Sequence, residues 1–114
     1  MNKETFMRKG TNEVAITAGS IYTIQYLTDA EKNDNLPHNQ LTITNRSTEE
    51  LYIYLDDMIN TEVPDFTLKA GQQMFISHEE GIIFHTLFIK NVDITNQVEI
   101  NELKFRISTV KEVF

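Results

Sequence analysis

Three histidines are the side chains of this chain best suited to acid–base or metal chemistry. His38, His78 and His85 form neither an H-x-H nor an H-E-x-x-H pattern, the spacings that bring two imidazoles to one metal ion. His78 and His85 could meet across a hairpin beside Glu79, as in a cupin, but the paired H-x-H of that pattern is missing. We therefore predict no metal and no cofactor, and keep a small cupin-like enzyme as an alternative.

Carboxylates occur as adjacent pairs near the ends of expected strands. Neighbouring residues on a strand point to opposite faces, so Glu49-Glu50, Asp56-Asp57 and Glu79-Glu80 are poor bidentate sites. The sequence contains no P-loop, no dinucleotide-binding glycine motif and no G-x-S-x-G nucleophile motif. It also contains no Cys, which excludes disulfides, thiolate ligands and thiol nucleophiles. These features predict a protein that is not an enzyme.

The elements that would position any site are short strands. Apolar residues recur at every second position in brief runs, and turn residues separate the runs. Runs spaced at roughly 10–15 residues are typical of a small all-β sandwich or barrel. With 114 residues, the chain suits one domain. We predict a single-domain antiparallel β-sandwich, jelly-roll-like and of about eight strands, over residues 13–114, preceded by a flexible N-terminal arm over 1–12.

Several local expectations follow from the turn signals. Gln40–Asn45 and Leu51–Asp56 are separated by a short polar connection, which favours a hairpin between them. Gly71 lies in a tight turn that favours a positive φ. Ile82–Lys90 is the longest apolar run and is expected to be one strand.

The two-residue period also predicts the core, because one phase of each strand must face inward. The expected core consists of Ile16, Ile24, Leu41, Ile43, Leu51, Ile53, Leu55, Phe66, Leu68, Leu87, Ile89, Leu103, Phe105 and Ile107. Lys104 and Arg106 occupy the other phase, which indicates a solvated back face for the last strand.

Some strands carry aromatic side chains on the phase opposite the core. A solitary domain would prefer polar residues there, so these aromatics suggest a contact surface between subunits. The alternative is that a loop or the other sheet of the same chain covers them. With two apolar residues of the arm, the predicted interface residues are Phe6, Met7, Tyr52, Tyr54, Phe75, Phe84 and Phe88.

Charge and composition narrow the possible partners. The net charge of −7 argues against binding nucleic acid or an anionic membrane. The lack of Cys favours a reducing compartment, and the polar first ten residues do not predict a signal peptide. No apolar run approaches the length of a membrane-spanning helix.

Three segments between Leu41 and Asn91 carry a resemblance. They read LTITNRSTEELYIYLDD, DFTLKAGQQMFIS and LFIKN, and contain the patterns I-T-N-x-S and F-x-L-x-A-G-Q. This stretch resembles small β-sandwich proteins of tailed bacteriophage particles, of the capsid-decoration, head-fibre and tail-accessory kinds. The resemblance implies a non-enzymatic, multi-copy protein held in a virion by contacts with its own copies and with other virion proteins.

The sequence therefore predicts a bacteriophage structural protein, made in the host cytoplasm and located in the virion as a homo-oligomer. A second class stays open: a soluble module that binds carbohydrate or another ligand. In that case, exposed tyrosines would stack on sugar rings, and the candidates are Tyr22, Tyr26, Tyr52 and Tyr54.

Overall fold

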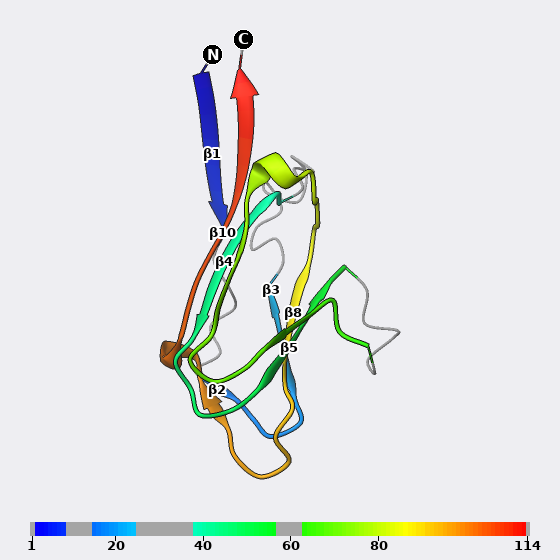
Figure 1. The fold of residues 1–114 in the computed structure, drawn as a ribbon, viewed down its shortest axis with the longest axis vertical. Helices are drawn as coiled ribbons and strands as arrows, with labels where there is room; N and C mark the ends of the chain where they lie inside the picture. Colours follow the sequence, from blue (N-terminus) through cyan, green and yellow to red (C-terminus); the bar gives the residue numbers. More distant parts are fainter. Residues whose placement is uncertain (1, 9–14, 25–37, 57–62, 114) are drawn as a thin grey trace.

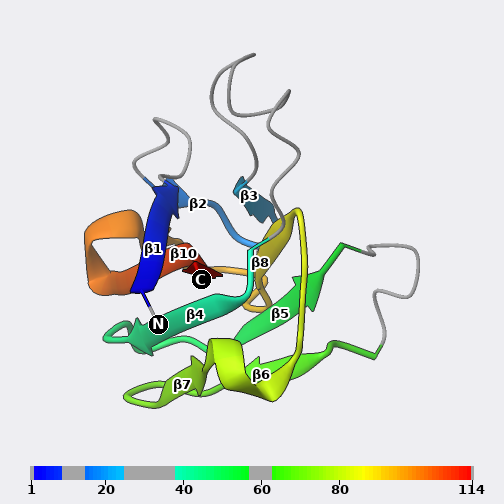
Figure 2. The same ribbon diagram turned by 90° about the horizontal axis from the view of Figure 1, so that it is seen from above.

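The computed structural model describes residues 2–8, 15–24, 38–56 and 63–113, with side chains described from 15 to 110 within those ranges. Two four-stranded sheets pack against each other, as Figures 1 and 2 show from two directions. The first, called the β4 sheet, has the order β1 (Asn2–Arg8), β10 (Leu103–Val113), β4 (Gln40–Asn45) and β7 (Gln73–Ile76). The second, called the β5 sheet, has the order β3 (Ile21–Ile24), β8 (Leu87–Asn91), β5 (Leu51–Leu55) and β6 (Phe66–Leu68).

Four smaller elements complete the described structure. A short ladder joins β2 (Ala15–Ile16) to β9 (Val98–Glu99), and two 3₁₀ turns are η1 (His78–Glu80) and η2 (Ile100–Glu102). Within the described ranges, no helix is long and apolar enough to cross a membrane.

The strands pair in a nested series. β1 pairs with β10, β2 with β9, β3 with β8, β4 with β7 and β5 with β6, always antiparallel. The chain therefore behaves as one long hairpin that folds over on itself, and two further pairings, β10 with β4 and β8 with β5, close the sheets. This is jelly-roll topology. The predicted all-β sandwich is confirmed.

The core lies between the two sheets, and the inward phase of the strands fills it. Eleven of the predicted core residues are buried, and Leu55, Phe66 and Phe105 are partly buried against them. The observed core also contains aromatic and aliphatic side chains that the predicted set did not include: Tyr22, Ile76, Phe84 and Val98. The predicted positive φ of Gly71 is also confirmed, at 78°.

The predicted hairpin between Gln40–Asn45 and Leu51–Asp56 is wrong. β4 and β5 lie in different sheets, and β4 pairs with β10 and β7 instead. In a nested jelly roll, a short connection carries the chain across from one sheet to the other. Short sequence separation therefore does not indicate pairing here.

The predicted strand over Ile82–Lys90 begins only at Leu87. Before it, Phe84 forms an isolated bridge with His38, donating to its carbonyl at 2.9 Å and accepting at 2.6 Å. The two-residue period does not run through this irregular segment. Ile83 shares the phase of Leu87 and Ile89 and would face inward in a regular strand, but it is 61% exposed. Phe84, predicted on the opposite phase, is fully buried.

Residues 2–8, which belong to the segment predicted as an arm, form the regular strand β1 along β10. β10 extends beyond β4, and its last part projects with β1 as a two-stranded ribbon (Figure 1). The register pairs Lys3 with Glu112 and Glu4 with Lys111, so residues of opposite charge stand opposite each other. At the base of the ribbon, the Asn39 side chain bonds both the N–H and the carbonyl of Val110, each at 2.8 Å.

Ile53 provides a test of this core, because it is fully buried and pairs with Phe66 and Ile89 on either side. Ile53→Ala is expected to lower the free energy of unfolding by about 2–5 kcal/mol, through lost burial and a cavity. Chemical denaturation measures this change. Thr67→Ala, at an exposed position of β6, serves as the control and should stay within about 0.5 kcal/mol of wild type. An unchanged unfolding midpoint for Ile53→Ala would contradict the core assignment.

Candidate functional site

A buried asparagine ends β4 and organises the adjacent turns. Asn45 is fully buried, and its side-chain NH₂ donates to the carbonyls of Glu49 at 2.7 Å and Leu68 at 3.1 Å. Its Oδ1 accepts from the N–H of Ser47 at 3.0 Å and the Ser47 hydroxyl at 2.6 Å. One amide thus bonds backbone groups of both the β4–β5 connection and the end of β6.

A second buried asparagine does the same at the end of β8. The Asn91 NH₂ donates to the carbonyls of Ile16 at 3.1 Å and Asn96 at 2.8 Å, and its Oδ1 accepts from the N–H of Asp93 at 3.1 Å. These bonds tie the β8–β9 loop to the end of β2. The Gly19 N–H adds a bond to the carbonyl of Asp93 at 2.9 Å, which fixes the loop to the β2–β3 turn.

The β8–β9 loop presents an apolar residue at its tip. The Asp93 carboxylate accepts from the N–H of Thr95 at 2.8 Å and from the N–H of Asn96. These two backbone hydrogen bonds, that of Asn96 first, hold the pKa of Asp93 below its usual value. Ile94, which lies between Asp93 and Thr95 in the sequence, is 90% exposed. The loop is therefore fixed from inside while its tip remains open to solvent.

Three of the predicted interface aromatics come together on the outer face of the β5 sheet. Tyr54 and Phe88 are cross-strand partners, and the rings of Tyr52 and Tyr54 lie 6.5 Å apart at 74°. Tyr52 and Phe88 are half-buried. Tyr54 is only 1% exposed, and this burial, with a smaller contribution from Tyr52 and Asp65, raises the pKa of its hydroxyl.

The other predicted interface residues do not join this group. Phe84 is fully buried in the core, its ring 5.3 Å from that of His38, so it cannot contact another subunit. Tyr54 is likewise covered by its own chain, as the alternative explanation anticipated for such side chains. Phe75 is 59% exposed but lies on β7, in the other sheet. The backbones of Phe6 and Met7 lie in β1, and their side chains are outside the described part of the structure.

Burial also affects the ligand-binding alternative. Tyr22 and Tyr54 are each 1% exposed, so neither can stack on a sugar ring. Tyr26 lies outside the described residues. Of the four tyrosines, Tyr52 alone is shown with a partly accessible ring.

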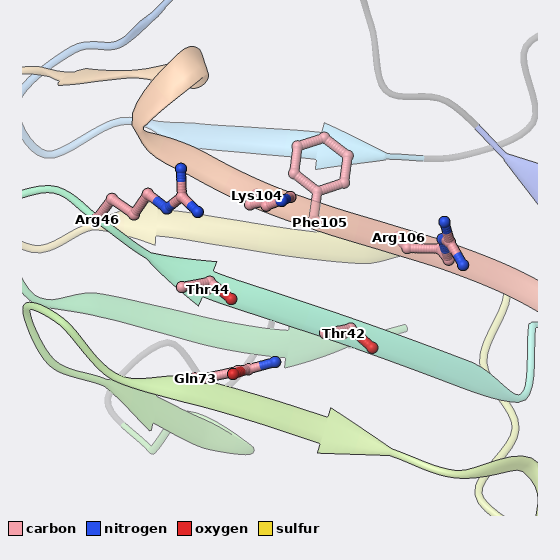
Figure 3. Close-up of a pocket in the computed structure, with 7 residues that line it drawn as sticks. All are labelled: Thr42, Thr44, Arg46, Gln73, Lys104, Phe105 and Arg106. Atoms are coloured by element: carbon pink, nitrogen blue, oxygen red, sulfur yellow. The ribbon is translucent and has the colours of Figure 1, made fainter.

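A cationic pocket lies on the outer face of the β4 sheet. Its cavity is about 520 Å³, and Figure 3 shows the side chains that line it, from β4, the residue after it, β7 and β10: Thr42, Thr44, Arg46, Gln73, Lys104, Phe105 and Arg106. The register aligns Lys104 with Thr44 and Arg106 with Thr42, so the basic residues stand beside a row of hydroxyls. The alternation of the last strand predicted only a solvated back face for Lys104 and Arg106, and Arg46 lies in the polar connection that follows β4.

The histidines do not converge. His78 lies in η1, where its Nδ1 is 3.2 Å from Oε1 of Gln40, and His85 lies in the irregular segment before β8. Over the part of the chain that is described, no group of three or more His, Asp or Glu side chains could hold a metal ion.

Comparison with known proteins adds no relative: no family model, no curated protein and no solved structure matches this chain.

Asn91 offers a direct test of the buried amides. Asn91→Ala is expected to lower the free energy of unfolding by about 2–3 kcal/mol, because the buried carbonyl of Ile16 and the partly buried backbone groups of Asp93 and Asn96 lose their partner. The matched control is Asn101→Ala, at an exposed position of η2, which should change stability by less than about 0.5 kcal/mol. Equal effects of the two substitutions in urea denaturation would show that the hydrogen bonds of the Asn91 amide do not stabilise the fold.

The Asp93 loop is expected to respond to acid. Since the folded-state pKa lies below the ordinary value of 3.8, the carboxylate stabilises the loop above that pH, and the stabilisation is lost as the pH falls through the lowered pKa. NMR titration should show Asp93 protonating below 3.8, with the N–H signals of Thr95 and Asn96 shifting in step. In Asp93→Asn these shifts should be absent; their persistence would assign them to another group.

Proposed function

We propose that this chain is a non-enzymatic structural protein of a bacteriophage virion, which assembles with its own copies and with other virion proteins. The observation that carries the proposal is the aromatic outer face of the β5 sheet. There Tyr52 and Phe88 keep part of their surface accessible over the covered ring of Tyr54. Tyr and Phe are enriched at protein interfaces, and charged residues are depleted at interface centres.

The fold supports the proposal as an analogy. Jelly rolls form viral capsid domains, but they also form lectins and cupins, so topology alone does not select among these functions. The aromatic face favours the structural role over a sugar-binding one, because two of the four candidate stacking tyrosines, Tyr22 and Tyr54, are almost completely buried.

The aromatic face makes a prediction about assembly. Tyr52→Asp and Phe88→Asp each place a charge where the proposed contact excludes water, so each should reduce incorporation into particles by about tenfold or more. Thr67→Asp is the control, because Thr67 is exposed and is the cross-strand partner of Tyr52. Circular dichroism verifies that each variant folds, and quantitative mass spectrometry of purified particles measures incorporation. Folded variants that incorporate as wild type does would show that this face is not a contact.

The functional class itself is tested by composition. Mass spectrometry of density-purified phage particles from the source culture should find this chain in a fixed ratio to the major capsid protein. Its absence from particles in which other virion proteins are detected would overturn the proposal.

A further inference from the structure

We propose that the cationic pocket of one copy binds the acidic loop surface of a second copy, with Ile94 at the centre of the contact. This inference deepens the proposed function and rests on it only in requiring several copies together. The contact joins two different surfaces of the same chain, so it is a head-to-tail contact that repeats from copy to copy.

The pocket concentrates positive charge in an acidic protein. The chain has 10 Lys and Arg against 17 Asp and Glu, yet three of those ten cations, Arg46, Lys104 and Arg106, line one cavity. None of its described lining residues is acidic. Among the described residues, no ion pair or side-chain hydrogen bond engages these three side chains. Their charge is available for an external carboxylate, which a guanidinium binds through two parallel hydrogen bonds.

An exposed aromatic ring borders the same pocket. Thr42 of β4 pairs with Arg106 on one side and with Phe75 of β7 on the other, so the three residues form one row across the sheet. Phe75 is 59% exposed. The pocket therefore combines fixed cations with an apolar rim, and a fitting partner carries carboxylates around an apolar side chain.

The β8–β9 loop and the β4–β5 connection supply such a partner. Glu49, Glu50, Val92, Asp93 and Ile94 line a shallow hollow beside the loop tip, and no described cation contributes to it. The Asn96 side chain donates to Glu49 at 3.1 Å, which joins the two segments. Because hydrogen bonds already fix this loop, binding needs little further ordering of its backbone, and such preorganisation favours affinity.

The apolar tip of the loop distinguishes a second copy from other polyanions. At a net charge of −7, the chain as a whole repels nucleic acid and anionic glycans at long range. A second copy carries the same net charge, but it presents its acidic surface on a loop whose apolar tip fits the rim at Phe75. Within one copy, no ion pair between the two surfaces occurs in the described residues, so each surface stays available to a neighbour.

Two charge reversals test the contact in the full-length chain. Arg106→Glu disables the pocket, and Glu50→Lys disables the acidic surface, so each variant alone should self-associate about tenfold more weakly than wild type in sedimentation equilibrium. Mixed together, the two variants should form a one-to-one complex with the affinity of the wild-type contact, because one keeps an intact acidic surface and the other an intact pocket. Wild-type association should weaken as NaCl rises from about 0.05 to about 0.5 M, because this change shortens the electrostatic screening length about threefold. Lys69→Glu, an exposed cation outside the pocket lining, is the control and should behave as wild type.

Three results would overturn the inference. The first is wild-type protein that stays monomeric at millimolar concentration, and the second is a mixture that associates no better than its components. The third is tight binding of heparin, used as a sulfated glycan probe, by monomeric wild-type protein but not by Arg106→Glu, which would assign the pocket to a glycan. None of these results decides the virion role, because the detection of the chain in purified particles tests that role separately.

Discussion

The described architecture depends on two buried asparagine side chains, which make hydrogen bonds to the backbone groups of the connections at one end of the sandwich. Four chain reversals meet there, and an irregular backbone cannot satisfy its own N–H and carbonyl groups as a sheet does. Asn45 and Asn91 each end a strand with the side chain pointing inward, and each bonds backbone groups from two different segments. Removing either amide leaves several buried or partly buried polar groups without this partner, whereas the side chain of an exposed asparagine can bond to water instead.

Both surfaces in the proposed contact between copies follow from this constraint. Asn45 immediately precedes Arg46, whose N–H is fixed at 2.8 Å to the carbonyl of Glu102, so the pocket begins where the amide network ends. Asn91 holds the loop that carries Asp93 and Ile94. Rigid loops can present charge and an apolar tip in a defined geometry. The buried amides that stabilise the fold therefore also position both surfaces of the proposed contact.

The period of the sequence predicted the fold class and most of the core, because alternation is a local property of each strand. It held a further signal: Asn45 continues the inward phase of Leu41 and Ile43, and Asn91 that of Leu87 and Ile89, so both asparagines could have been predicted as buried. Strand pairing could not be predicted from spacing, since nested pairing is non-local. The burial of Tyr54 could not be predicted either, because the two-residue period places it on the phase opposite the core, where it is nonetheless only 1% exposed. The cationic pocket could not be predicted, because Arg46 is distant in sequence from Lys104 and Arg106 and only the pairing of β4 with β10 brings them together.

Hydrogen exchange of the asparagine side-chain amides tests the central claim most directly. NMR can follow the NH₂ protons of Asn45 and Asn91 beside those of Asn101, which is exposed. The NH₂ groups of Asn45 and Asn91 are buried, and each donates hydrogen bonds to two backbone carbonyls. Their protons should therefore exchange at least about 100-fold more slowly than those of Asn101, because exchange requires local opening of the structure. Exchange of Asn45 and Asn91 at the rate of Asn101 would show that neither amide is locked in the interior, and the account of this end of the molecule would fail.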